Sequence, residues 1–194
     1  MQPEFISDKI YHIYNRGNNY EEIFYEERNY SYFLRLVERY ILPIAIVYAY
    51  CLIPNHFHLV LKFRKTDGLP EKYRTGNRKI YHAFSDMFNA YVKSINKAYG
   101  RRGSLFQKVL KRKVISDDYQ LREVIRYVHR NPIKHGLKDN VSDYVHSSYN
   151  DIVNRRTGIV SFFESIELFD DLENFIYCHH EKDLQGLEDL EDLK

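Results

Sequence analysis

The chain has 194 residues, of which 44% are hydrophobic and 29% are charged, so the composition fits a folded domain and excludes a disordered chain. The longest apolar run, residues 41–53, is interrupted by Pro43 and is shorter than the roughly 20 residues of a membrane span, so no membrane association is expected. The formal net charge is +2, but residues 62–134 hold 19 Lys and Arg against 6 Asp and Glu, whereas residues 161–194 hold 2 against 11. A basic middle indicates a nucleic-acid surface, with a solvated helix face as the alternative.

The first half of the chain predicts a strand, a helix and a hairpin. Residues 9–14 have the alternation of a strand and end at a turn-forming cluster. Apolar residues at helical spacing predict a helix from Glu26 to Ile41. The β-branched and aromatic runs 44–53 and 56–63 flank a tight turn, and together they predict a β-hairpin.

The second half predicts two longer helices around one strand. We expect a loop over 66–78, a helix from about residue 79 that ends at Gly100, a strand over 105–115, and a helix over 117–130 that ends before Pro132. The tail from Ser142 is expected to be helical in pieces, and its last ten residues to be soft and acidic.

This order of elements predicts an α+β fold. Strand, helix, strand, strand, helix, strand is the split βαβ pattern of a ferredoxin-like sandwich with an antiparallel sheet, here with additional C-terminal helices. The first and third strands would lie at its centre. We expect one domain over residues 1–150 and an acidic, helical extension over 151–194. Cys51 and Cys178 show no metal-binding or disulfide spacing, and the N-terminus has no signal sequence, so a reducing cytoplasm is expected.

His56 and His58 are candidate metal ligands. On a strand, alternate side chains share a face, so both imidazoles would point the same way while Phe57 points into the core. Two imidazoles on one face can share a divalent cation. Two surface histidines at a strand end are the alternative.

Tyr127 is a candidate nucleophile. The predicted helix places Glu123, Tyr127 and Asn131 at successive i+4 steps on one face, with Arg126 and Arg130 beside them. A tyrosine hydroxyl can attack a phosphodiester and hold it as a covalent ester. A phenol with a pKa of about 10 loses its proton at neutral pH at a cost of roughly 4 kcal/mol, which a nearby cation must offset. The alternative is a packing tyrosine, because the chain has 18 of them and Tyr25 has the same spacing to an asparagine.

A run of cations precedes that helix. The predicted strand carries Gln107, Lys108, Lys111, Arg112 and Lys113, which could contact a sugar-phosphate chain. An edge strand protected by lysines is the alternative.

Taken in order, these residues resemble the single-tyrosine HUH transposases, especially the branch of REP-associated tyrosine transposases. The matching segments are Tyr11–Asn18, Ile23–Phe24, Ile53–Val60, Gly103–Gln107, Tyr127–Gly136 and Ser147–Tyr149. They cover roughly residues 9–150. Each segment is weak by itself, and their order is what makes the resemblance specific.

The resemblance implies an enzyme that nicks and rejoins single-stranded DNA near hairpins. His56 and His58 match the pair that binds Mg²⁺ or Mn²⁺, Asn131 matches the third ligand, which is Gln in some relatives, and Tyr127 matches the nucleophile. The product of attack would be a 5′-phosphotyrosine, so no nucleotide cofactor is needed, and the lack of a P-loop pattern agrees with that. The resemblance also suggests DNA contacts from Arg16, from the cationic strand, and from Arg126 and Arg130.

Two other functions remain open at this point. A ferredoxin-like sheet can bind single-stranded nucleic acid without cutting it. A replication-type initiator or nuclease could use the same centre. Either a monomer or a homodimer is compatible with the sequence, and the short distance along the chain from the last strand to Tyr127 favours a monomer.

Overall fold

Four strands form one antiparallel sheet in the computed structural model, which describes residues 4–181. The strands are β1 (Ile10–Arg16), β2 (Ala45–Ile53), β3 (His56–Phe63) and β4 (Lys111–Ile115). Their order across the sheet is β2-β3-β1-β4, so the first and third strands are central, as predicted. The predicted ferredoxin-like α+β class is confirmed.

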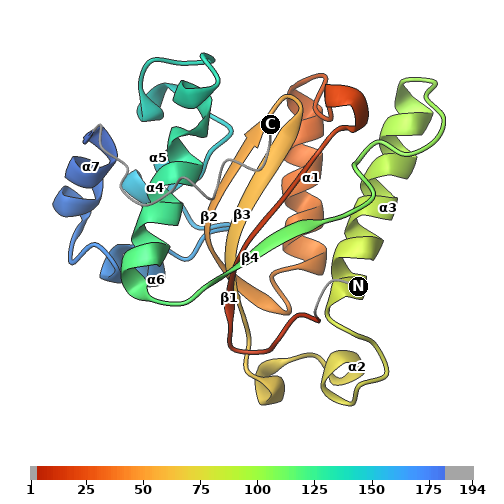
Figure 1. Ribbon diagram of the computed structural model, residues 1–194, viewed down its shortest axis with the longest axis horizontal. Coiled ribbons are helices and arrows are strands. Elements are labelled where there is room, and N and C mark those ends of the chain that lie inside the picture. The colour runs from red at the N-terminus through yellow and green to blue at the C-terminus, as the bar shows by residue number, and fades with distance from the viewer. Residues whose placement is uncertain (1–3, 182–194) are drawn as a thin grey trace.

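Helices cover both faces of the sheet. They are α1 (Glu27–Tyr40), α2 (Glu71–Arg74), α3 (Tyr81–Ala98), α4 (Asp118–Lys134), α5 (Tyr149–Val153), α6 (Phe162–Glu167) and α7 (Leu172–His180). In Figure 1, α1 and α3 lie on one side of the sheet, and α4 lies on the other side with the additional C-terminal helices. Among the described residues, no helix is both long and apolar enough to cross a membrane.

The two faces of the sheet bury different kinds of side chain. Phe57 points to the α1 and α3 side, where its ring lies 5.0 Å from that of Phe33 and 5.7 Å from that of Phe88. Burying one such ring stabilises the fold by roughly 1.5–3 kcal/mol. Because successive side chains of a strand alternate, His56 and His58 point to the α4 side. The apolar core on the α1 and α3 side therefore holds β3 in place, and the histidines of β3 face the α4 side.

Two predicted boundaries were wrong. The strand predicted over 105–115 begins only at Lys111, because Gln107 donates its backbone N–H to Arg16 in an irregular segment that forms one isolated bridge, between Gly17 and Phe106, and no ladder. The helix predicted to end at Arg130 continues through Pro132 to Lys134. A proline so near the C-terminal end removes a single helical hydrogen bond, and the last turn still closes.

The outer edge of β2 is covered by the chain that follows α4. Leu52 donates its N–H to the carbonyl oxygen of His146, and Ser148 donates to that of Tyr50. Covering an edge satisfies backbone groups that would otherwise invite pairing with another chain. The predicted domain boundary at residue 150 falls within α5. The last ten residues, predicted to be soft and acidic, lie outside the described residues.

Candidate active site

β3 and α4 bring together the four residues predicted to form the centre. His56 and His58 begin β3, and Tyr127 and Asn131 lie one turn apart on α4. The ring of Tyr127 meets that of His58 edge-on, with 5.8 Å between centroids, and Asn131 Oδ1 lies 3.4 Å from His56 Nε2. All four side chains are buried.

The hydrogen bonds of His56 aim a lone pair at Asn131. His56 Nδ1 lies 2.7 Å from Asn55 Oδ1, which accepts, so Nδ1 carries the proton and Nε2 carries a lone pair. Asn131 Nδ2 donates to the carbonyl oxygen of Tyr127 at 3.3 Å, which leaves Asn131 Oδ1 facing His56 Nε2. Two acceptors therefore face each other with no proton between them.

His58 has one paired and one unpaired ring nitrogen. Its Nδ1 lies 2.9 Å from His12 Nε2, while its Nε2 is buried and has no hydrogen-bond partner among residues 4–181. Burial lowers the pKa of His58 well below 6.5, and burial together with the nearby His135 ring lowers the pKa of His56 to about 3. Both rings are therefore neutral near pH 7, which is the form that binds metals.

These donors fit a divalent cation. A cation would satisfy at once the His58 nitrogen that lacks a partner among the described residues and the facing acceptors of His56 and Asn131. Imidazole nitrogen suits divalent transition-metal ions, and amide oxygen suits Mg²⁺ and Mn²⁺. Residues 4–181 contain no group of three or more His, Cys, Asp or Glu side chains placed to hold a metal. The third donor to such a cation would be the neutral amide of Asn131. Three protein donors leave positions for phosphate oxygens or water.

Two supporting residues, Asn55 and His12, were not predicted. Asn55 directly precedes His56 in the hairpin turn, so its position in the sequence was a signal for it. His12 reaches His58 across strands, because β1 pairs with β3 so that Tyr14 lies opposite His58. That contact depends on the register, which sequence spacing alone does not give.

Three of the predicted DNA-contacting cations lie on the same face as the histidines. Lys111 and Lys113 pair opposite Tyr14 and His12 in β1, so their side chains point to the α4 side. Arg16 pairs opposite the first residue of β3 and belongs to that face too.

The other three residues of the cationic run are placed differently. Arg112 points to the α3 side, where its guanidinium lies over the ring of Phe5 at 4.2 Å. Together with Gln107 and Lys108 it lines a cavity of about 1050 Å³ beside α3. These residues are therefore not gathered around the histidines.

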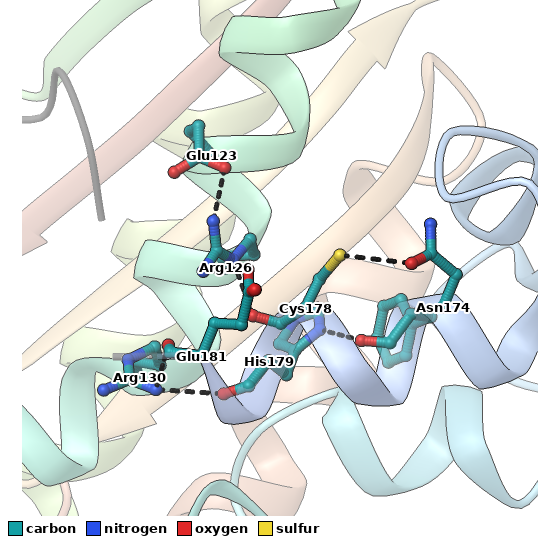
Figure 2. A network of polar contacts seen from close by, with 8 residues as sticks. Glu123, Arg126, Arg130, Asn174, Cys178, His179 and Glu181 are labelled. Atoms are coloured by element: carbon teal, nitrogen blue, oxygen red, sulfur yellow. Dashed lines mark hydrogen bonds and ion pairs between the residues drawn. The ribbon is translucent and has the colours of Figure 1, made fainter. Parts of the chain in front are cut away.

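Arg126 and Arg130 bind the end of α7 (Figure 2). Arg126 donates to Glu123 Oε1 at 2.6 Å and to the carbonyl oxygen of Cys178 at 2.8 Å, and Arg130 donates to that of His179 at 2.9 Å. Cations at the C-terminal end of a helix complement its dipole. Their role toward DNA stays a prediction, and their contacts shown in Figure 2 are internal to the protein.

Comparison with known proteins supports the resemblance seen in the sequence. No family model matches the chain. A curated protein of Haemophilus influenzae, described as a REP-associated tyrosine transposase, is 26% identical over 103 residues, which is 52% of this chain and 57% of that relative. The solved structure of a REP-associated tyrosine transposase bound to a REP hairpin matches with a TM-score of 0.60 and 18% identity, over 80% of this chain and 85% of that one. The resemblance is thereby confirmed: this chain is similar in sequence and in fold to the REP-associated tyrosine transposases.

Proposed function

We propose that this protein is a metal-dependent, single-tyrosine DNA transposase that cuts and rejoins single-stranded DNA beside hairpins. One observation carries the proposal: the buried Nε2 of His58, which has no partner within residues 4–181, lies beside the facing acceptors of His56 and Asn131, with the ring of Tyr127 against them. The similar transposase of known structure was solved with a REP hairpin, which supports hairpin DNA as the ligand.

The centre takes its proposed ligands from both β3 and α4, and its nucleophile from α4. His56 Nε2, His58 Nε2 and Asn131 Oδ1 would hold Mg²⁺ or Mn²⁺, and the bound cation would polarise the scissile phosphate. Tyr127 and Asn131 share α4, so the nucleophile and one ligand are fixed relative to each other by a single helical turn.

The covalent step conserves the energy of the phosphodiester. The Tyr127 hydroxyl oxygen forms a bond to phosphorus, the bond from phosphorus to the 3′ oxygen breaks, and the proton that the phenol loses is balanced by one that the 3′ oxygen gains. The products are a 5′-phosphotyrosine and a free 3′-hydroxyl. Lys134 Nζ lies 5.2 Å from the centre of the Tyr127 ring, and a cation there stabilises negative charge as it develops. Attack by a second 3′-hydroxyl reverses the step without ATP.

The surrounding cations would guide the strand to this centre. Lys111, Lys113 and Arg16 point to the same face as the histidines, so a phosphate chain crossing the end of β1 would meet them. Because the predicted ligands and the nucleophile come from one chain, a single copy holds a complete set.

The test is cleavage of hairpin DNA by Tyr127→Phe. The purified protein is incubated with Mn²⁺ and hairpin oligonucleotides that carry single-stranded flanks, and peptide-linked DNA is sought by mass spectrometry. The wild type should nick and form the adduct, and Tyr127→Phe should do neither. The matched control is Tyr25→Phe, which changes a tyrosine with the same spacing to an asparagine and should leave both unchanged.

Other results would assign a different function. Nicking that persists in Tyr127→Phe without an adduct would identify a hydrolytic nuclease that uses water. Binding in a gel without nicking by the wild type, over a range of hairpins and with either cation, would identify a binding module.

A further inference from the structure

His12 is a fully buried histidine that has no part in the proposed chemistry. It lies on the central strand β1, and its ring stacks on that of His58, with centroids 5.1 Å apart and planes 17° apart. Its Nε2 lies 2.9 Å from His58 Nδ1. That separation places a single proton between the two nitrogens, so one ring donates and the other accepts.

A hydrogen bond between two neutral imidazoles has two possible directions. If His58 Nδ1 donates to His12 Nε2, the remaining nitrogen of His58 carries a lone pair. If His12 Nε2 donates instead, His58 Nε2 carries the proton and has no lone pair to offer. Each direction leaves one buried N–H without an acceptor among residues 4–181, on His12 Nδ1 in the first case and on His58 Nε2 in the second, so metal binding is what distinguishes them. Only the first direction lets His58 bind a cation.

We infer that His12 is a positioning residue, which accepts the proton of His58 Nδ1 and thereby fixes the ring of His58 with the lone pair of its Nε2 toward the cation. Asn55 does the same for His56, where the acceptor is an amide oxygen 2.7 Å from Nδ1. Each predicted histidine ligand thus has its own acceptor, one from the hairpin turn and one from β1. Metal-binding histidines commonly need such a partner for the nitrogen that does not bind.

The ring of His12 also packs against aromatic neighbours, so a role in packing has to be separated from the proposed role in positioning His58. It stacks on Tyr14 at 4.8 Å and meets Tyr127 edge-on at 6.1 Å. His12→Phe keeps an aromatic ring of similar size but removes the acceptor. His12→Gln loses the ring but can place an amide oxygen toward His58.

The experiment measures Mn²⁺ affinity of the full chain without DNA, using calorimetry and the electron paramagnetic resonance of free Mn²⁺. His12→Phe should weaken binding by about 10- to 100-fold, and His12→Gln should restore most of it. Nuclear magnetic resonance of the metal-free wild type should show His58 protonated on Nδ1. Circular dichroism and thermal unfolding of each variant check that it folds.

The inference rests on the proposed metal site, and its failure can be distinguished from that of the site. If the wild type and His58→Ala both fail to bind Mn²⁺, the metal site and this inference fall together. If the wild type binds and His12→Phe binds equally well, or if His58 is protonated on Nε2 in the metal-free wild type, only the inference is overturned. Should His12→Phe not fold, His12→Gln and the resonance measurement still decide.

Discussion

The protein buries two groups of histidine rings, and they differ in whether every ring nitrogen has a partner. In the open cluster, formed by His12, His56 and His58, the Nε2 of His58 and the Nδ1 of His12 have none among the described residues. The closed cluster is formed by His129, His179 and Ser148, and both nitrogens of each ring are used.

Hydrogen bonds in the closed cluster run in one direction. His179 Nδ1 donates to the carbonyl oxygen of Phe175 at 2.7 Å, so its Nε2 must accept from His129 Nδ1 at 2.8 Å. His129 Nε2 then accepts from the hydroxyl of Ser148 at 2.7 Å. No ring nitrogen of His129 or His179 is left to bind a ligand, so this cluster has a structural role and holds α7 against α4.

Burial alone therefore does not mark a functional histidine. Burial lowers the pKa of His129 well below 6.5 and that of His179 to about 3, much as it does for His58 and His56. The distinguishing feature is the unused lone pair. Substitutions in the two clusters should therefore separate a ligand-binding role for the open cluster from a structural role for the closed one.

The largest expected effect is on metal binding. His58→Ala removes one of three proposed donors and should weaken Mn²⁺ binding by at least about 100-fold, since even the loss of a supporting partner costs up to that much. Calorimetry with folded protein measures it. His179→Ala, in the closed cluster, should bind Mn²⁺ as the wild type does; if it loses binding as His58→Ala does, the distinction between the clusters fails.

A second expected effect is on stability. His179→Ala leaves the buried N–H of His129 without an acceptor and creates a cavity beneath α7. It should therefore lower the free energy of unfolding by about 2 kcal/mol. Urea titration measures this quantity. The neighbouring His180 is exposed, and His180→Ala should change it by less than about 0.5 kcal/mol. A similar decrease in the free energy of unfolding in His179→Ala and His180→Ala would contradict the role of His179 in holding α7 against α4.

The free energy of unfolding should also depend on pH. The folded pKa of His179 is about 3, below the value of 6.5 expected when unfolded, so the unfolded chain takes up protons first as the pH falls. The stability from this histidine is complete above pH 6.5 and should fall by about 1.4 kcal/mol per pH unit below it. Urea unfolding at pH 7, 6 and 5 should show this slope reduced by that amount in His179→Gln, and an unchanged slope would refute it.

The smallest expected effect concerns DNA on the face of the open cluster. Lys111→Gln and Lys113→Gln should each lower the salt dependence of oligonucleotide binding by about one unit of log–log slope. Arg112→Gln is the matched control, because its side chain points to the opposite face, over Phe5. Fluorescence anisotropy over a range of salt concentrations measures the slope. If Arg112→Gln changes the slope as much as the two lysine variants do, the DNA does not bind to the face of the open cluster alone.

The sequence predicted what depends on local periodicity. Alternation along one strand put His56 and His58 on a common face, and helical spacing put Tyr127 and Asn131 one turn apart. The order of elements also predicted that β1 and β3 would be central.

What the sequence missed depends on contacts between distant segments. The partner of His58 follows from the register of β1 on β3, which no local pattern specifies. Arg126 and Arg130 were expected to face DNA, and their contacts with α7 come from residues about fifty positions later in the chain. The start of β4 was misjudged because residues 105–110 have strand-like composition but bond to the turn after β1.

Only Ser116 and Asp117 separate β4 from α4. That connection can stretch by no more than about 10 Å, so the first turn of α4 stays close to the end of its own β4. Under the proposed function, each molecule would supply one nucleophilic tyrosine and would hold one severed DNA end at a time. Joining two ends would require either two molecules meeting on the DNA or one molecule that waits, still attached to the first end, for the second to arrive.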